Sequence, residues 1–254
     1  MSKANYPQGF ALANGISHSF YQELGRNPSR AQRFGLAMSA FTTGDEYSMR
    51  HLVAGYLWDQ LPSGSTIVDI GGSHGDAAFA LAESYPDLNI IVQELPEVVE
   101  NAKSREREGV KVKFMPHNMF DPQPIRASIY LLRSVLHNWP DSYAICALQA
   151  LIPALRPGAR VLLMEGIMPG RGELENMEER RVRTMDLVMM EVGNAKERSE
   201  EEWKKLFEEA DGRWRWVGVR TMVGSALGIL EAVWEGDGDG GDWEEKTGNT
   251  VIEA

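Results

Sequence analysis

The chain has 254 residues, 43% hydrophobic and 25% charged, which is typical of a folded domain with a well-buried core and excludes a disordered polypeptide. Its formal net charge of −11 comes without a basic stripe, so nucleic acid is disfavoured as a partner. It lacks both an apolar run of about 18 residues and the apolar core of a signal peptide, so we expect no membrane association and a cytoplasmic location.

Residues 1–60 are predicted to form a helical lead-in. Apolar side chains recur at helical spacing around Phe34 and Met38, and again over residues 49–57. A Pro-Ser-Gly run at residues 62–64 then breaks the pattern, because proline lacks the backbone donor that a continuing helix needs. A new unit therefore begins near this point.

Strand-like and helix-like patterns alternate over the following hundred or so residues. Short apolar runs predict strands at 66–70, 89–93, 111–115, 128–133 and 159–165. Helical spacing predicts helices at 76–84, 96–104 and 142–155. Such alternation implies right-handed crossovers between parallel strands, so we predict a mostly parallel sheet.

Helical patterns return after the fifth predicted strand. One covers roughly residues 175–192, and a second starts after Ser199, where Glu202 completes a capping box. Two strand-like runs follow at 213–220 and 226–233. Residues 236–254 are rich in glycine and aspartate, carry much of the negative charge and are predicted to form a disordered tail.

The most informative motif joins the first predicted strand to the helix after it. Its sequence is Gly-Gly-Ser-His-Gly at residues 71–75, and glycines let a backbone turn tightly and let a ligand come close. A helix starting near Gly75 would present free N–H groups to that ligand. The spacing differs from the G-x-G-x-x-G of dinucleotide-binding folds, and a plain turn without a ligand remains an alternative.

The second predicted strand leads directly into Glu94. An acid at the tip of this strand can accept hydrogen bonds from both hydroxyls of a ribose. A short glycine turn combined with a ribose-binding acid fits a nucleoside cofactor that has no pyrophosphate. The two motifs together therefore indicate S-adenosylmethionine.

Polar side chains follow several predicted strands at their carboxyl ends, where open parallel sheets bind their ligands. They are Glu94, His117, Asn118, Arg133, Ser134, His137 and Glu165. His137 lies in a turn before a helix start, and Glu165 ends an apolar strand, where an unpaired carboxylate is costly. We therefore predict that Glu165 orients His137 as a general base, the alternative being a turn histidine bonded to the backbone.

Other chemistries lack their motifs. The chain has no H-E-x-x-H or C-x-x-C, so no metal is expected, and it has no G-x-S-x-G elbow of an α/β-hydrolase. The single Cys146 excludes an internal disulfide and, lying in an apolar helical pattern, is predicted to be a buried packing residue. Met185 and Met189 lie at helical spacing and could either line a ligand pocket or pack in the core.

The segments that carry these motifs resemble S-adenosylmethionine-dependent O-methyltransferases of the caffeate/flavonoid type, in particular their fungal secondary-metabolite branch. The segments are 68–75, 92–96, 117–120, 130–141, 163–165 and 194–198, spread in family order over most of residues 10–235. The resemblance implies an α/β, Rossmann-like class I methyltransferase fold, with a seven-stranded, mostly parallel sheet, one antiparallel strand and helices on both faces. Residues 61–235 would form the S-adenosylmethionine-binding catalytic domain.

The resemblance also implies a role for each matching position. The cofactor, which would become S-adenosylhomocysteine, would be bound by Asp69, Gly71, Gly72, Gly75, Glu94, Leu95, Asn118, Met119 and Arg133. His137 would be the general base, with Glu165 and Glu197 flanking its imidazole. The pocket of a small aromatic acceptor would be lined by Phe34, Met38, Met185, Met189 and Asn194. The methyl group would pass, without a metal, to a phenolic or enolic hydroxyl of a polyketide-type metabolite.

Some features depart from the usual family pattern. Ser73 replaces a common glycine, Asn118 replaces an acid near the adenine, and Asn138 replaces an aspartate after the base. Serine is small enough to be tolerated, whereas Asn118 is expected to weaken cofactor binding. Only 65 residues precede the first predicted strand, so we expect most of the family's N-terminal dimerisation region to be absent. A homodimer and a complete acceptor pocket are therefore both left open.

Two alternatives to methyl transfer remain. Some relatives with this fold use the bound cofactor without methyl transfer, for example in pericyclic reactions. A shortened chain could also be a non-catalytic domain that binds a cofactor or a partner. The presence of His137, Glu165 and Glu197 favours methyl transfer.

Overall fold

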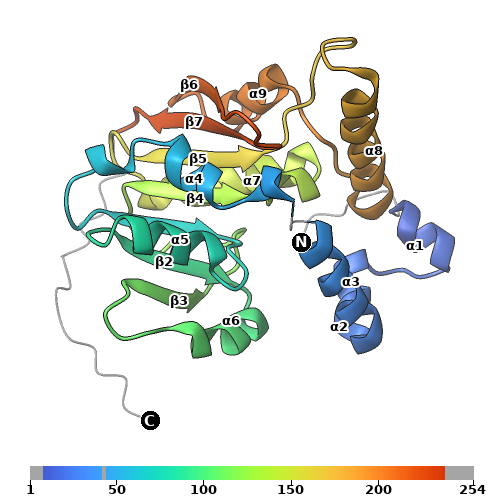
Figure 1. Cartoon of the computed structure of the whole chain (residues 1–254), viewed down its shortest axis with the longest axis horizontal. Helices are drawn as coiled ribbons and strands as arrows, with labels where there is room; N and C mark the ends of the chain where they lie inside the picture. The colour runs from blue at the N-terminus through green and yellow to red at the C-terminus, as the bar shows by residue number, and fades with distance from the viewer. Residues whose placement is uncertain (1–7, 42–43, 238–254) are drawn as a thin grey trace.

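The centre of the molecule is a seven-stranded sheet, shown in Figure 1. The computed structural model describes residues 8–41 and 44–237. The strands are β1 (Thr66–Ile70), β2 (Asn89–Glu94), β3 (Val112–Pro116), β4 (Ile129–Arg133), β5 (Arg160–Glu165), β6 (Trp214–Thr221) and β7 (Gly228–Trp234). Their order is β3-β2-β1-β4-β5-β7-β6; β7 is antiparallel to both of its neighbours, β5 and β6, and the other pairs of described strands are parallel. The predicted sheet, mostly parallel with one antiparallel strand, is confirmed.

Helices cover both faces of the sheet, as predicted. The helices of the described segments are α1 (Gly9–Asn14), α2 (Phe20–Arg26), α3 (Pro28–Phe41), α4 (Arg50–Gly55), α5 (Asp76–Ser84), α6 (Pro96–Ala102), α7 (Asp141–Leu151), α8 (Asn176–Gly193) and α9 (Glu200–Ala210). Short 3-10 turns are η1 (Asp45–Tyr47), η2 (Trp58–Gln60), η3 (Lys103–Arg105), η4 (Leu136–Asn138) and η5 (Ile152–Ala154). α7 and α9 pack on one face, whereas α4, α5 and α6 pack on the other.

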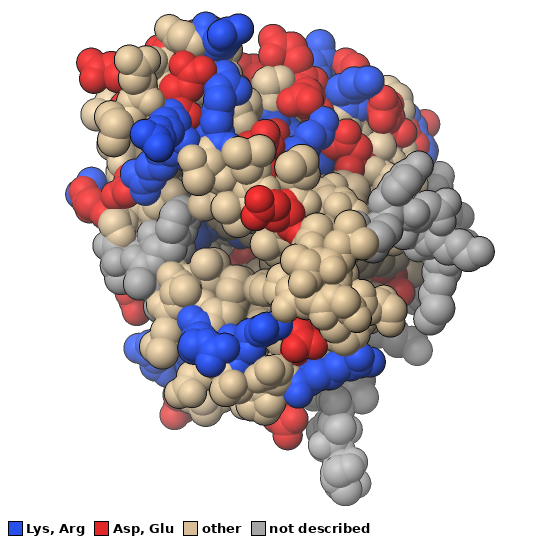
Figure 2. All heavy atoms as spheres, turned by 90° about the vertical axis from the view of Figure 1, so that its right-hand side faces the viewer, with Lys and Arg blue, Asp and Glu red and all other residues tan. Residues whose placement is uncertain are grey.

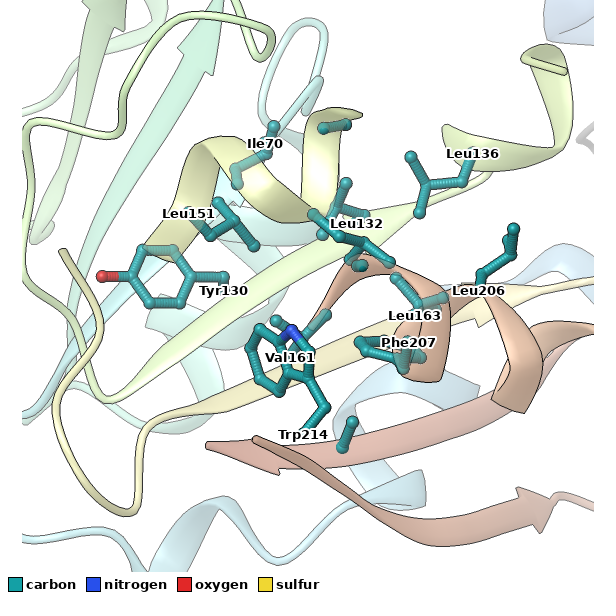
Figure 3. Packing of buried hydrophobic residues seen from close by; sticks show 14 of the residues in the cluster. Ile70, Tyr130, Leu132, Leu136, Leu151, Val161, Leu163, Leu206, Phe207 and Trp214 are labelled. Atoms are coloured by element: carbon teal, nitrogen blue, oxygen red, sulfur yellow. The ribbon is translucent and has the colours of Figure 1, made fainter. Parts of the chain in front are cut away.

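The central strands divide the core into two layers. In β4, Tyr130 and Leu132 face the layer under α7 and α9, and Ile129 and Leu131 face the opposite layer. Successive side chains of a strand point to opposite faces, so a strand covered on both sides must be apolar throughout. Figure 3 shows the first of these layers, which also contains Leu136 of η4. The core therefore reaches the turn that carries His137.

The helix predicted over residues 142–155 differs in two details. α7 ends at Leu151, and Pro153 lies in the 3-10 turn η5, because proline has no N–H to continue an α-helix. Cys146, which we predicted to be buried, is exposed. Its helical position points away from the sheet, whereas Ala147 and Leu148 face the core. An apolar neighbourhood in sequence did not make Cys146 part of the packed face.

α8 and the first three helices lie beside the sheet, at the right of Figure 1. No residue of α8 is buried. α1 packs closely on α8 at Gly9, where an added Cβ would lie 3.2 Å from the main-chain oxygen of Glu191. None of the helices in the described segments combines the length and apolarity of a membrane span. Residues 238–254, which make up most of the predicted acidic tail, lie outside the described residues.

Candidate active site

The carboxyl ends of the parallel strands meet at one edge of the sheet, and the predicted polar residues lie there. Glu94 ends β2, Arg133 ends β4 and Glu165 ends β5. Because β4 and β5 pair in parallel, Arg133 lies opposite Met164, the residue before Glu165. Side chains from three different strands are thus brought to one region.

The glycine-rich loop follows β1 and ends at Gly75, the N-cap of α5. Gly71 and Gly75 have φ angles of +68° and +80°, which glycine adopts without strain. Gly72 has no room for a side chain, because an added Cβ would lie 2.9 Å from Cγ1 of Val92 and would meet the carboxylate of Asp69. Three glycines are therefore required by the shape of this loop.

Two sets of contacts hold the loop in place. Ser73 has a φ of +52°, an uncommon value for a residue with a side chain, and its N–H donates to Oε1 of Glu94 at 3.2 Å. From the outside, Nη1 of Arg105 donates to the main-chain oxygen of His74 at 2.6 Å and to the carboxylate of Asp76 at 2.7 Å. These bonds offset the strain that serine brings to a position suited to glycine.

Asp69 is buried and Arg133 half-buried near this loop, and both have buried polar atoms without hydrogen-bond partners among the described residues. Asp69 is 1% exposed, and neither of its carboxylate oxygens has a hydrogen-bond partner among the described residues. Burial raises the pKa of Asp69 to about 7, although the positive charge of Arg133 opposes the shift. Nη2 of Arg133 donates to the main-chain oxygen of Tyr47 at 2.8 Å, while its buried Nε has no partner within the described chain. Such groups mark a place where polar groups of a ligand fit.

Glu94 presents its carboxylate at the tip of β2. Oε1 accepts the N–H of Ser73, and Oε2 accepts the N–H of Leu95 at 3.0 Å. A carboxylate oxygen can accept more than one hydrogen bond, so both oxygens keep capacity for a pair of hydroxyls. The acid expected to hold a ribose is thus already oriented by the loop.

The segment after β3 lies beside the same strand end. The N–H of His117 donates to the main-chain oxygen of Glu94 at 2.9 Å. Asn118 is exposed, and its Oδ1 accepts the N–H of Phe120 at 3.2 Å. Met119 is half-buried against the core. The two residues predicted to flank an adenine are therefore adjacent to the predicted ribose-binding acid.

His137 lies in the 3-10 turn η4, and 18% of its side chain is exposed. Its Nδ1 is 2.9 Å from Oε1 of Glu197. The main-chain N–H of Glu197 donates to Oδ1 of Asp186 on α8 at 2.9 Å, which fixes the carboxylate-bearing residue. An ionised carboxylate can only accept, so Nδ1 carries the proton and Nε2 keeps a free lone pair.

The pKa of His137 lies above its ordinary value. Burial lowers the pKa of the imidazole, but the negative charges of Glu165 and Glu197 outweigh that effect, and the positive charge of Arg198 opposes them only in part. The histidine is therefore a stronger base than an exposed imidazole.

Glu165 does not hold the imidazole in the way the sequence led us to expect. It is fully buried, and its Oε1 accepts the main-chain N–H groups of Val135 and Leu136 at 2.9 and 2.8 Å. Among the described residues, only Glu197 accepts a hydrogen bond from the ring of His137. Because Glu165 ends β5 next to this turn, its carboxylate accepts hydrogen bonds from the backbone N–H groups of the turn. Glu165 therefore acts on His137 through its charge and through the turn's backbone.

The C-terminal end of α8 packs against the turn that carries His137. An added Cβ at Gly193 would lie 2.9 Å from the main-chain oxygen of Asn138. Asn194 caps α8 in the left-handed conformation, with a φ of +52°. Met189 and Met185, about one and a half and two and a half turns earlier, are half-buried. Three of the predicted acceptor-pocket residues thus lie on the helix that reaches the candidate base.

The first helices approach the same turn through Tyr21, which sequence reasoning missed. The hydroxyl of Tyr21 on α2 donates to Oδ1 of Asn138 at 3.2 Å. Phe34 on α3 makes an edge contact with Tyr21, with ring centroids 6.4 Å apart. Met38, further along α3, is 42% exposed. The sequence around Tyr21 does not indicate a contact with Asn138, 117 residues away, because that contact depends on how α2 packs in the folded chain.

The sequence model of the O-methyltransferase domain matches residues 4–212. The O-methyltransferase of the grayanic acid biosynthesis cluster of Cladonia grayi is 40% identical over 236 aligned residues, covering 91% of this chain and 52% of the relative. The chain spans about half the length of the curated relatives it matches.

Solved structures resemble most of the chain. NcsB1, an O-methyltransferase from neocarzinostatin biosynthesis in complex with S-adenosyl-L-homocysteine and 1,4-dihydroxy-2-naphthoic acid, matches with a TM-score of 0.72 and 27% identity, over 88% of this chain and 63% of that one. A pericyclic reaction enzyme matches with a TM-score of 0.72 and 24% identity, over 90% of this chain and 58% of that one. These matches confirm the class I methyltransferase fold expected from the sequence.

Proposed function

This chain belongs to the O-methyltransferase domain family, and from that premise we propose that it moves a methyl group from S-adenosylmethionine to a phenolic or enolic hydroxyl of an aromatic secondary metabolite. The observation that carries the proposal is the pair of His137 and Glu197. The carboxylate engages Nδ1, so Nε2 is left with a free lone pair. A general base in this state, near a loop suited to a nucleoside cofactor, is what methyl transfer to a hydroxyl requires.

The residues around the glycine-rich loop fit S-adenosylmethionine. The unpaired carboxylate of Asp69 suits the cofactor's ammonium group, and the unpaired Nε of Arg133 suits its carboxylate. The carboxylate of Glu94 would accept the ribose hydroxyls, while the bare backbone at Gly72 leaves room for the ligand. When bound, the cofactor would supply an activated methyl group on its sulfonium.

His137 would take the proton of the acceptor hydroxyl at Nε2. A phenol has a pKa of about 10, so near neutral pH it needs a base within hydrogen-bond reach as its oxygen becomes nucleophilic. Glu197, bonded to Nδ1, would stabilise the imidazolium that forms. Alignment of the two reactants would supply much of the remaining rate.

The surroundings of His137 favour a flat acceptor. Met185 and Met189 offer polarizable, half-buried side chains on α8. The hydroxyl of Tyr21 donates to Asn138, the residue after His137, and the ring of Phe34 contacts that of Tyr21. Figure 2 looks onto the side where α8 and the first helices lie and shows a hollow near its centre, with a rim made mostly of uncharged residues. The related NcsB1 binds 1,4-dihydroxy-2-naphthoic acid. We therefore expect a polyketide-type aromatic acceptor.

The test combines calorimetry with product analysis. The protein should bind S-adenosylmethionine and S-adenosylhomocysteine, and mass spectrometry of a hydroxylated aromatic panel should show a gain of one methyl group on at least one member. Cofactor binding together with rearranged but unmethylated products would instead support a pericyclase-like use of the cofactor. Failure to bind either nucleoside would overturn both enzymatic proposals and leave a partner-binding domain.

Replacing Glu197 by glutamine is expected to lower kcat by about 10- to 100-fold. The amide lacks the negative charge that helps to raise the pKa of His137, so that pKa should fall. In the pH dependence of kcat/KM, the rise in activity should therefore begin at lower pH. Glu201→Gln, an exposed change on α9, is the matched control and should alter neither quantity. An unchanged pH profile in the Glu197 variant would contradict the assignment of the pair.

A further inference from the structure

The turn that carries His137 is held through its backbone from two sides. On one side, Glu165 accepts the N–H groups of Val135 and Leu136, as described above. On the other side lie the main-chain oxygens of Leu136 and Trp139, which flank the histidine; the Leu136 oxygen accepts the N–H of Trp139 within the turn and can accept a second donor. Both oxygens accept hydrogen bonds from one arginine, Arg198.

Arg198 is fully buried, which is rare for an arginine unless its donors are satisfied. Nη1 donates to the oxygen of Leu136 at 3.1 Å, and Nη2 donates to the oxygen of Trp139 at 2.7 Å. Nε donates to Oδ1 of Asp141 at 2.9 Å, and the guanidinium lies 4.8 Å from the ring centroid of Trp203. The planar fork thus has a partner on each edge and an aromatic ring on one face.

The backbone of Arg198 is fixed as well. Its main-chain oxygen accepts the N–H of Met168 at 2.8 Å, and Ile167 forms an isolated parallel bridge with it. The preceding residue is Glu197, which holds the imidazole itself. One short segment therefore controls both the ring of His137 and the peptide groups around it.

We propose that Arg198 is a positioning residue: its guanidinium clamps the carbonyl groups on both sides of His137 and keeps the imidazole in the orientation that proton removal needs. The proposal rests on the proposed function of His137 as the general base. Arg198 donates to backbone and carboxylate oxygens, so it acts through the turn. Arg198 thus supports the proposed reaction although its hydrogen bonds go to groups other than the imidazole of His137.

Arginine at this position has two separable properties, shape and charge. Lysine keeps the positive charge but has a single ammonium in place of a planar fork, so it cannot serve three acceptors spread around a plane. Methionine has a similar length and removes the charge as well. The charged groups that act on His137 are Glu165 from β5, Glu197 and Arg198, and of these only Arg198 lowers the pKa of the imidazole.

These two properties predict different outcomes for two variants. Arg198→Lys should lower kcat by about 10- to 100-fold, because small displacements of a catalytic group cost rates of that size. Its Kd for S-adenosylmethionine and the midpoint of its pH profile should stay close to those of the parent protein. Arg198→Met should show a similar loss and, in addition, a midpoint shifted to higher pH.

The matched controls are Arg215→Lys and Arg215→Met, on the edge strand β6, where the arginine forms an exposed ion pair with Glu235. They should leave kcat, cofactor affinity and the pH profile unchanged. Calorimetric binding of S-adenosylhomocysteine and far-ultraviolet circular dichroism verify that each variant is folded. Parent-like kcat in folded Arg198→Lys would overturn the clamp while leaving the proposed function intact.

A second measurement does not depend on turnover. The imidazole of His137 can be followed by NMR in histidine-labelled protein, with its signal identified by its loss in His137→Gln. Arg198→Met should raise the pKa of this imidazole and move its chemical shifts, whereas Arg215→Met should do neither. If no acceptor is methylated by the parent protein, the proposed function fails, but this titration still decides the clamp. Unchanged shifts and an unchanged pKa in Arg198→Met would refute it.

Discussion

Replacing His137 by glutamine is expected to lower methyl transfer by about 10²- to 10⁴-fold while leaving the affinity for S-adenosylmethionine nearly unchanged. Glutamine keeps a polar side chain of similar length, and Glu197 can still accept a hydrogen bond from it. It offers no basic nitrogen, so the acceptor hydroxyl keeps its proton. Among the described residues, the cofactor loop after β1 makes no hydrogen bond to this side chain, so binding should persist. Single-turnover assays and calorimetry measure the two quantities separately.

The pH dependence provides an independent check on the same residue. In the parent protein, kcat/KM should rise as pH increases through the pKa of His137, which lies above the ordinary histidine value, because the neutral imidazole is the active form. This rise should disappear in the glutamine variant. His18→Gln, on the segment before α2, is the matched control and should behave like the parent. Retention of more than about a tenth of the parent rate would argue against His137 as the base.

Replacing Asp69 by asparagine is expected to weaken the binding of S-adenosylmethionine by at least about 10-fold and, at alkaline pH, to stabilise the cofactor-free protein. The two effects share one cause. Asp69 is buried, and neither of its oxygens has a partner within the described part of the chain, so its ionised form is costly until a cationic group of a ligand binds to it. Asparagine removes the charge, and with it both the cost in the free protein and the attraction for the ligand.

The sign of the stability effect follows from the pKa. Burial raises the pKa of Asp69 to about 7 in the folded chain, against an ordinary value of 3.8. Between these values the folded protein keeps a proton that the unfolded chain has lost, so the free energy of unfolding falls as pH rises. The penalty is complete above about pH 7 and amounts to the order of 2–4 kcal/mol. Asp69→Asn should therefore be the more stable protein at pH 8, and the difference should vanish near pH 4.

Urea unfolding of both cofactor-free proteins at several pH values measures this difference. Asp87→Asn, an exposed change in the loop before β2, is the control and should show no pH-dependent gain. Calorimetry in buffers of different ionisation enthalpy should show proton release when the parent protein binds the cofactor near pH 6.5, and none for Asp69→Asn. An asparagine variant that binds the cofactor as tightly as the parent would refute the role of this carboxylate.

Much of the site followed from where predicted strands end. Glu94, Arg133 and Glu165 were each expected at the end of a strand, and parallel pairing brings such ends to one edge. The glycine loop could be located because Gly71, Gly72 and Gly75 answer local backbone requirements. These are properties of short segments, which apolar runs and glycine spacing reveal directly.

The groups that individual side chains contact were harder to predict from the sequence. We expected both Glu165 and Glu197 to flank the imidazole. Glu197 accepts the hydrogen bond from the ring, whereas Oε1 of Glu165 accepts backbone N–H groups and acts on the ring through its charge. Cys146 lies in an apolar pattern but is exposed, because helical phase decides which side faces the sheet. In both cases the environment of the side chain is formed by other segments.

The amino-acid sequence by itself determined the alternation of strands and helices, the glycine loop and the polar residues at the strand ends, since these depend on local periodicity and backbone freedom. Only the tertiary structure decided that Arg198, in a run of charged residues that could equally be solvated, is fully buried against the turn of His137. Arg198 and the turn of His137 are some sixty residues apart in the chain. They are in contact because the end of α8 packs next to the end of β4. Burial and hydrogen-bond partners are set by that packing, and they turn the glycine loop and a strand-end histidine into one candidate site.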